Sequence, residues 1–438
     1  MEPQTNLRKS WYVVGVLTLA YISSFIDRQI LSLLVEPIKR DLQISDTQIS
    51  LLMGLSFGIF YTILGIPIAR LADLQSRKQI IGWGIGLWSF MTVVCGMVGN
   101  FTQLFFARMG VGVGEAALSP AAYSMIADLF PKSKLAMANS VYNMGIFIGS
   151  GLAFLIGGLV VNIVKVKEMW YVPLVGEVFP WQVVFFFVGL PGFLVVLLIS
   201  RIKEPIRQGS EGDKASLSQT WIFILKNANT YININLGLGF LTLVNYANAA
   251  WIPSFFVRTY GWTASRAGTI YGILVVIFCT LGLWCGGKLA DNFTQKGYPD
   301  GKIRACICLI GGLLVCCWIF PLMPNGEWAA WAIIPVAFFS ASPLGAGTAA
   351  IAEVTPNRMR AMTSALYLFM VNILGLVFGP LSVALLTDKY FHDTTMIRYS
   401  ILIVMVFGTF LGLLFMYLSL KPYQKMLLLQ PKSSLNNE

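Results

Sequence analysis

The sequence predicts an all-α membrane protein with twelve transmembrane helices in two six-helix, pseudo-symmetric bundles, and three observations carry this prediction. Of the 438 residues, 56% are hydrophobic and only 12% are charged, whereas a soluble domain carries about 25% charged residues. The hydrophobic residues gather in runs of about 20, the length that a helix needs to cross the hydrocarbon core. Short motifs in the first half of the chain also return in the second half.

Twelve apolar runs predict the twelve spans, and charged or helix-breaking segments separate them. The expected spans are 11–35, 47–69, 79–99, 102–127, 136–161, 181–200, 231–256, 265–289, 303–323, 328–351, 361–387 and 398–420. An even number of spans places both termini on one side of the membrane. The loops on that side hold most of the Lys and Arg residues, which predicts that both termini are cytoplasmic.

The longest polar stretch lies between the sixth and seventh runs and predicts a linker between two bundles. We expect an N-terminal bundle over 1–200, a cytoplasmic linker over 201–230, a second bundle over 231–420 and a cytoplasmic tail over 421–438. The linker segment from Trp221 to Lys226 is expected to form a short amphipathic helix at the membrane interface.

Repeated motifs relate the two predicted bundles. Leu71-Ala72-Asp73 returns as Leu289-Ala290-Asp291, Asp128…Pro131 returns as Glu353…Pro356, and the segment 136–142 is similar to 361–367. Two parallel six-helix repeats are an architecture of membrane transporters, with the substrate site near the midplane between them.

The loop after the second span resembles a known motif. Ala69 to Lys78 resembles the major facilitator superfamily pattern G-x-L-x-D-R-x-G-R-R/K; Ala69, Leu74 and Ser76 depart from it. Arg108-x-x-x-Gly112-x-Gly114 resembles a second signature of that superfamily, and Gly375-x-x-x-Gly379-Pro380 matches its exporter pattern. Gly145-x-x-x-Gly149 matches the exporter pattern only in part, because Ser150 replaces the proline.

Two further blocks resemble the spinster-like branch of the superfamily. They are Ser24-Phe25-Ile26-Asp27-Arg28-Gln29 and Gly112-Val113-Gly114-Glu115-Ala116-Ala117-Leu118-Ser119-Pro120. Eukaryotic members of that branch transport lipids of the sphingosine 1-phosphate or lysophospholipid type, so the resemblance implies a lipid-like substrate. The Asp-Arg pair also occurs in symporters of organic anions such as sugar acids, which keeps that substrate class open.

Four charged residues fall near the centre of predicted spans, and all four lie in the first bundle: Asp27, Arg28, Arg108 and Glu115. A charge at that depth is costly and normally faces a cavity or a partner. Burial raises the pKa of a carboxyl group and a nearby arginine lowers it again. We therefore expect Asp27 and Glu115 to couple transport to protons, with Arg108 as modulator and Gly112 leaving that helix face open. The alternative is a static Asp27–Arg108 pair that joins two spans.

The other candidate residues are expected to contact the substrate or to latch the cytoplasmic side. Arg28 could clamp an anionic head group or pair with another helix. The resemblance places the seventh and tenth spans at the cavity, where amides and aromatic residues could contact substrate or hold helices together: Asn245, Tyr246, Asn248, Trp251 and Ser340. The superfamily's loop motif implies a cytoplasmic gate with six charged residues: Asp73, Arg77, Lys78, Asp128, Asp291 and Glu353.

These features predict a proton-coupled secondary active transporter that moves an amphipathic, lipid-like substrate by alternating access. The rivals are a symporter of a small organic anion, a multidrug-type exporter and, in another class, a membrane receptor or passive facilitator. We expect no enzyme activity, metal, cofactor or nucleic acid partner, because the sequence holds no P-loop, no nucleophile motif and no metal-ligand cluster. His392, the only histidine, is expected at the surface, and the seven cysteines are expected to pack as small hydrophobic residues. The short tails are typical of a bacterial protein of the cytoplasmic membrane, expected to be a monomer.

Overall fold

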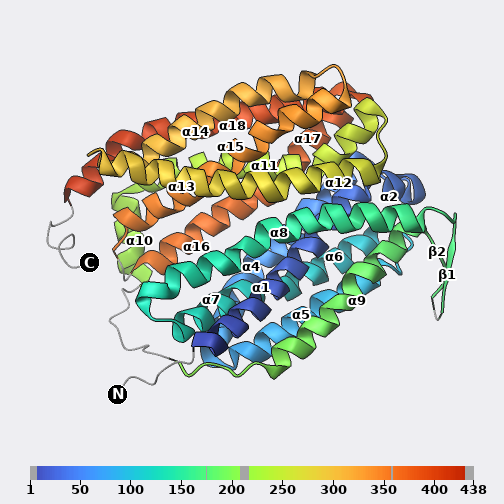
Figure 1. Ribbon diagram of the computed structural model, residues 1–438, viewed down its shortest axis with the longest axis horizontal. Coiled ribbons are helices and arrows are strands. Elements are labelled where there is room, and N and C mark those ends of the chain that lie inside the picture. Colours follow the sequence, from blue (N-terminus) through green and yellow to red (C-terminus); the bar gives the residue numbers. More distant parts are fainter. Residues whose placement is uncertain (1–6, 174, 208–216, 357–358, 430–438) are drawn as a thin grey trace. The chain divides into compact units, whose positions relative to one another are not determined.

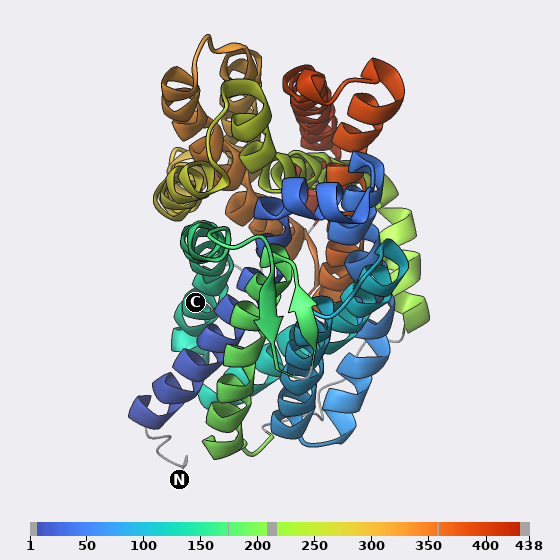
Figure 2. The ribbon, with the colours of Figure 1, turned by 90° about the vertical axis from the view of Figure 1, so that its right-hand side faces the viewer.

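The protein folds almost entirely into long helices in the computed structural model, which describes residues 7–173, 175–207, 217–356 and 359–429 (Figure 1). A short hairpin in the first half pairs strand β1 (Trp170–Val172) antiparallel to β2 (Gly176–Val178), with Trp170 opposite Val178. Figure 2 shows this hairpin facing the viewer. The all-α membrane class predicted from composition is confirmed.

The chain divides into two compact units, and unit 1 includes two segments from the second half of the sequence. Unit 1 combines 1–210 with 249–276 and 380–397. Its helices up to residue 210 are α1 (Leu7–Gln29), η1 (Ile30–Leu33), α2 (Val35–Leu42), α3 (Asp46–Ser50), η2 (Leu51–Leu55), α4 (Ser56–Leu74), α5 (Arg77–Cys95), α6 (Phe101–Glu115), α7 (Leu118–Leu129), α8 (Lys132–Val164) and α9 (Pro180–Arg201). Within this unit α1 packs on α8, and α5 packs on α9.

Unit 2 combines 211–248, 277–379 and 398–438. The helices of the second half are α10 (Leu217–Lys226), α11 (Ala228–Tyr260), α12 (Ala264–Leu274), η3 (Val275–Cys279), α13 (Thr280–Gln295), α14 (Gly301–Ile319), η4 (Phe320–Leu322), α15 (Gly326–Val354), α16 (Arg360–Val371), η6 (Asn372–Val377), α17 (Phe378–Leu385), η7 (Leu386–Phe391), η8 (Thr394–Met396) and α18 (Ile397–Leu429). The end of α11, all of α12 and the residues around η7 therefore belong to unit 1. The predicted boundaries at 200, 230 and 420 stay predictions.

Within the described ranges, ten helices are long and apolar enough to cross a membrane. The two remaining predicted spans correspond to α5 and to α6 with α7. The span predicted at 102–127 is interrupted because Pro120, in the first turn of α7, has no amide hydrogen to continue the ladder of α6. Backbone hydrogen bonds of 3.2 Å from the Ala116 amide to Gly112 and from the Ala117 amide to Gly114 close the end of α6, the second one spanning only three residues.

The repeat in the sequence is also visible at the N-termini of α6 and α15. Asn100 caps α6 by accepting a hydrogen bond from the Gln103 amide, and Asn325 caps α15 in the same way through Trp328. An asparagine at this position satisfies an amide that the helix leaves unpaired. The spacing between the two caps equals the spacing between Asp128 and Glu353.

Glycines allow close helix contacts within each unit. A Cβ on Gly149 of α8 would lie 2.7 Å from the carbonyl oxygen of Ile22 on α1, and one on Gly379 would lie 2.7 Å from that of Leu243 on α11. Gly112 was expected to leave a helix face open, and this expectation is wrong. A Cβ there would lie 2.6 Å from the carbonyl oxygen of Phe57, because α4 packs directly against α6.

Candidate functional site

The four predicted intramembrane charges all lie buried in unit 1. The exposed fraction is 1% for Asp27, 8% for Arg28, 0% for Arg108 and 2% for Glu115. Asp27 and Arg28 are near the end of α1, and Arg108 and Glu115 lie two turns apart on α6. Helices α1 and α6 therefore carry two acidic and two basic side chains away from water.

Arg28 and Glu115 form a direct ion pair. Nη2 of Arg28 lies 2.6 Å from Oε2 of Glu115, and the hydroxyl of Ser24 donates to the same oxygen at 2.5 Å. The guanidinium carbon of Arg28 also lies 4.6 Å from the ring centre of Phe25 and 4.4 Å from that of Phe57. The pair is held by charge, by a hydroxyl and by aromatic faces together.

The Arg108 side chain contacts the main chain of Asp27. Nη1 of Arg108 donates to the carbonyl oxygen of Asp27 at 3.3 Å, and no Asp27–Arg108 side-chain ion pair occurs among the described ion pairs. Within the described parts of the chain, Oδ1 of Asp27 and Nε and Nη2 of Arg108 are buried without a hydrogen-bond partner. The salt bridge thus joins Arg28 to Glu115, and Asp27 keeps a free acceptor.

An aromatic wall continues from the ion pair along α1, α7 and α8. The rings of Tyr21 and Tyr142 stack with centres 4.5 Å apart, and Tyr123 meets Tyr142 edge-on at 5.2 Å. The hydroxyls of Ser119 and Tyr142 lie 3.4 Å apart, and Tyr123 donates to Asn143 at 2.6 Å. Sequence reasoning missed this wall, although the i, i+4 spacing of Tyr21 and Phe25 was a signal for it.

In unit 2, the predicted polar residues lie mainly between α11 and α15. Nδ2 of Asn245 donates to the carbonyl oxygen of Ser340 at 3.0 Å, and the Ser340 hydroxyl donates to Ala337 at 3.0 Å. Asn248 is 4% exposed, and its Oδ1 has no partner among the described residues. Tyr246 lies beside Gly375. Asn245 and Ser340 thus bond across helices, while Asn248 keeps an unused acceptor.

Trp251 belongs to the part of α11 in unit 1 and is fully buried. Its indole nitrogen donates to the carbonyl oxygen of Pro380 at 2.9 Å. In this conformation the side chain joins α11 to α17 and fills the space between them.

The loop motif builds a cluster around Arg77, at the start of α5. The Arg77 guanidinium pairs with Asp128 and donates to the Ser124 hydroxyl at 2.9 Å and the Pro205 carbonyl at 2.8 Å. The Arg77 amide donates to Glu204 at 2.8 Å, and the hydroxyl of Ser76 donates to the same carboxylate. Burial raises the pKa of Glu204, but these hydrogen bonds outweigh burial and hold it below its ordinary value.

A similar cluster lies at the matching place in unit 2. Lys302 pairs with Glu353 at 2.9 Å, and Tyr423 donates to the same carboxylate. The spacing from Arg77 to Lys302 equals that from Asp128 to Glu353, so the two clusters are repeat-related. Arg360, at the start of α16, donates to the Thr355 carbonyl at 3.2 Å.

The other predicted gate residues have fewer described contacts. Asp291 is exposed near the end of α13, and Lys78 is half-buried in the first turn of α5. The side chain of Asp73 lies outside the described part of the structure.

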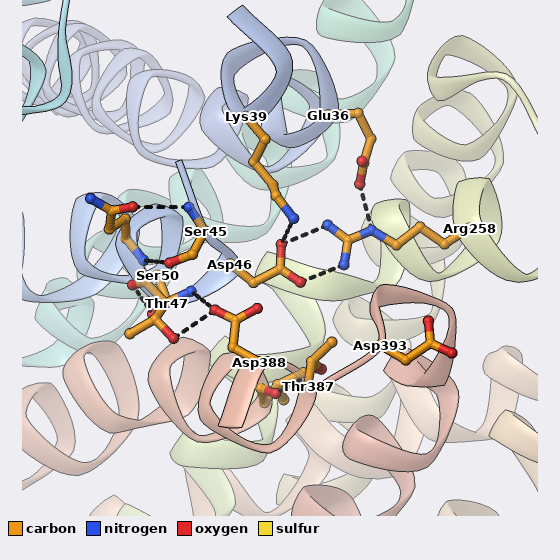
Figure 3. Close-up of polar contacts among 12 residues, drawn as sticks. Glu36, Lys39, Ser45, Asp46, Thr47, Ser50, Arg258, Thr387, Asp388 and Asp393 are labelled. Atoms are coloured by element: carbon orange, nitrogen blue, oxygen red, sulfur yellow. Dashed lines mark hydrogen bonds and ion pairs between the residues drawn. The ribbon is translucent and has the colours of Figure 1, made fainter. Parts of the chain in front are cut away.

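A second ion cluster, which we call the Arg258 cluster, comprises Glu36, Lys39, Asp46 and Arg258, all in unit 1 (Figure 3). Arg258 donates to both carboxylate oxygens of Asp46, at 2.6 and 2.8 Å, and to Glu36 at 2.7 Å. Lys39 also pairs with Asp46, whose side chain is 0% exposed. The cluster joins α2 and α3 of the first half of the chain to α11 of the second half.

Asp388 adds a neighbouring contact between the same two halves of the sequence (Figure 3). Its Oδ2 accepts hydrogen bonds from the amide and the hydroxyl of Thr47, at 2.6 and 2.7 Å. Sequence reasoning missed both contacts because Lys39, Arg258 and Asp388 follow the ends of predicted spans, in segments expected to be loops, where charges are common.

The long apolar helices, the repeated clusters and the buried charges define a polytopic membrane transporter. A family model described as Major Facilitator Superfamily matches residues 17–379, and the chain belongs to the major facilitator superfamily. A solved bacterial homologue of the human lysosomal transporter Spinster, in an inward-facing and unoccupied conformation, is 26% identical with a TM-score of 0.78 and 98% coverage of both chains.

Two curated relatives broaden the comparison. The chain is 28% identical to an MFS-type efflux pump of Mycolicibacterium smegmatis, over 88% of this chain and 86% of the pump. It is 24% identical to the sphingosine-1-phosphate transporter SPNS2 of Danio rerio, over 86% of this chain and 75% of that protein. The predicted superfamily and the resemblance to the spinster-like branch are confirmed, and the chain is a transporter of this type.

Proposed function

We propose that this transporter couples substrate movement to protons, and the Arg28–Glu115 pair with the neighbouring Asp27 carries the proposal. An ionised, buried carboxylate is costly unless a cation or hydrogen-bond donors balance it. Oε2 of Glu115 has both in Arg28 and Ser24, and its Oε1 is buried without a donor among the described residues. The Asp27 side chain has no cation among the described ion pairs, and its Oδ1 is also buried without a donor. The two carboxyl groups therefore differ in their need for a proton.

The Glu115 carboxylate and an anionic substrate can compete for the same guanidinium, that of Arg28. When Glu115 is ionised, it holds Arg28; when Glu115 takes a proton, its attraction for Arg28 falls. Arg28 is then available to bind a phosphate or carboxylate of the substrate. Asp27 would carry a proton as well, since its Oδ1 is buried without a donor among the described residues, and Arg108, which contacts the Asp27 carbonyl, would act as modulator.

The Arg258 cluster supports alternating access. It joins the two halves of the sequence on the side opposite to the predicted cytoplasmic termini. In a rocking mechanism such a contact must break before the site can open to that side. The Arg77 and Lys302 clusters brace helix ends inside each unit, and we propose that they form part of the cytoplasmic gate with Asp73, Lys78 and Asp291.

We propose an amphipathic, lipid-like substrate. Arg28 would hold an anionic head group, and Tyr123, which is 37% exposed beside the buried Tyr142, would offer an aromatic surface to the rest of the substrate. Similarity to the sphingosine-1-phosphate transporter supports this class. A small organic anion held by Arg28 is the second candidate, and similarity to an efflux pump keeps a multidrug-type exporter as the third.

The proposal also covers the oligomeric state, the membrane and the residues of unit 2. The protein would act as a monomer in a bacterial cytoplasmic membrane, with both termini inside, without catalysis and without a cofactor. Asn245, Asn248, Tyr246, Trp251 and Ser340 would form the less charged side of the substrate path.

Flux into liposomes tests the proposal. Purified protein is reconstituted, and uptake of a lysophospholipid, a sphingoid lipid and a sugar acid is measured with and without a pH gradient. Concentrative uptake of one class that collapses when the gradient is dissipated is expected. Uptake that only equilibrates would indicate a passive facilitator, and binding without flux would indicate a receptor; either result overturns the proposal.

A further inference from the structure

Helix α10 in unit 2 exposes large apolar side chains. Trp221, Ile222 and Leu225 are 47%, 65% and 59% exposed, whereas Ile224 is 5% exposed and packs inward. The helix ends at Lys226 and leads directly into the spanning helix α11. A short helix with exposed Trp and aliphatic residues beside a span is typical of the membrane interface.

An apolar groove lies beside α10. Its volume is about 360 Å³, and α10, the start of α11 and α16 line it. Its lining includes Trp221, Leu225, Ile232, Leu236, Leu366 and Met370. The groove thus offers a lipid acyl chain a surface of aliphatic and aromatic side chains.

A second hollow of about 410 Å³ adjoins this groove, because Leu225 and Ala228 line both. Lys226, Lys421 and Lys425 line the second hollow. Lys421 and Lys425 lie one turn apart on α18, where like charges repel. Among the described residues, no carboxylate forms an ion pair with any of the three lysines. The hollow therefore carries concentrated positive charge that an anion would relieve.

We propose that the two hollows bind one anionic membrane phospholipid, with its phosphate among the three lysines and one acyl chain in the groove. The loop charges predict that this end of unit 2 faces the cytoplasm, where anionic lipids attract juxtamembrane lysines. The occupant is a bilayer lipid, because a free phosphate would leave the groove empty. This site is separate from Arg28 and Glu115, and it does not depend on the proposed transport.

A thermal-shift titration of delipidated, detergent-purified protein tests the site. The probes are phosphatidylglycerol, phosphatidylcholine with the same acyl chains, and glycerol 3-phosphate. We expect a saturable rise in Tm with phosphatidylglycerol and none with the other two. Equal shifts with phosphatidylcholine would show that charge is irrelevant, and a shift with glycerol 3-phosphate would indicate a free-anion site; each overturns the proposal.

Matched variants locate the effect. K421Q/K425Q should weaken the response to phosphatidylglycerol by about tenfold or more in apparent affinity, since each lysine near a membrane surface contributes to anionic lipid binding. K9Q/K134Q removes the same charge from exposed lysines elsewhere on the predicted cytoplasmic side and should respond like the wild type. If K421Q/K425Q does not fold, K425Q alone is compared in the same way. Wild-type affinity in the lysine variant overturns the proposal.

A larger side chain at the junction of the two hollows tests whether an acyl chain occupies the groove. A228W places a large side chain where the two hollows meet. It should reduce phosphatidylglycerol binding and leave proton-driven flux unchanged. Undiminished binding in A228W would contradict an acyl chain in the groove.

Discussion

The Arg28–Glu115 pair dominates the chemistry at the scale of single residues. Both side chains are nearly inaccessible to water, so each charge depends on the other for compensation. Removing one member of such a pair leaves an uncompensated charge, whereas removing both does not. This asymmetry provides a direct test of the pair.

We expect R28M to destabilise the protein by about 3–5 kcal/mol, because Glu115 loses its cation. R28M/E115Q should recover part of that loss, since the buried carboxylate is gone as well. Thermal unfolding of the wild type, R28M, E115Q and R28M/E115Q in one detergent measures the coupling. The loss of stability in R28M/E115Q could instead equal the sum of the losses in R28M and E115Q. That result would show that the two side chains have no coupling free energy and would contradict the pair.

The sequence allowed the four charges to be found but not their pairing. A charge inside an apolar run stands out because few residues there are charged. Asp27 and Arg28 are adjacent in sequence, about 100° apart on the helix, and depth alone does not say which one faces Glu115. The packing of Phe25 and Phe57 around the guanidinium decides it, and such contacts depend on the neighbouring helix α4.

At the scale of elements, the contact between α4 and α6 depends on Gly112. We expect G112A to cost about 1–3 kcal/mol, because its Cβ would meet backbone that cannot move independently. G86A is the matched control, since a Cβ there meets nothing within 4 Å; it should be neutral or slightly stabilising. Thermal unfolding compares them, and equal stability of the two variants would contradict close packing at Gly112.

The Arg77 cluster predicts a pH effect on the start of α5. A carboxyl group whose pKa is lowered on folding stabilises the folded state above its ordinary pKa, and this contribution is lost as the pH falls through the lowered value. E204Q should therefore lower Tm at pH 7, and its difference from the wild type should shrink below about pH 4. The exposed Glu177 gives the control E177Q. A pH-independent difference for E204Q would contradict the carboxylate's role.

The Arg258 cluster predicts an effect on opening. R258Q removes three charged hydrogen bonds and should favour opening on that side. We expect a cysteine at the buried position Ile49, in a background without native cysteines, to react several-fold faster with maleimide in R258Q. R40Q changes an exposed arginine that pairs with its sequence neighbour Asp41 on α2 and should leave the rate unchanged. An unaltered rate in R258Q would contradict a gate at this cluster.

At the scale of the whole molecule, hydrophobic runs and repeated motifs were sufficient to predict the fold class, and the resemblance of the 69–78 loop and the Arg108–Gly114 signature to known patterns indicated the family. They did not predict the interruption between α6 and α7, or the transfer of 249–276 and 380–397 to unit 1. Run lengths report which segments enter the membrane, whereas grouping into units depends on contacts such as Arg258–Asp46 and Trp251–Pro380. Those contacts join distant parts of the chain and leave no periodic signal.

Proton movement with substrate tests the central claim most directly. Proteoliposomes that hold a pH-sensitive dye are exposed to the transported substrate without an imposed proton gradient. Substrate should drive a pH change inside the vesicles of wild-type protein, and D27N, which is expected to insert and fold, should show none. Substrate flux in the wild type without any pH change, or a wild-type proton signal in D27N, would contradict proton coupling through this cluster.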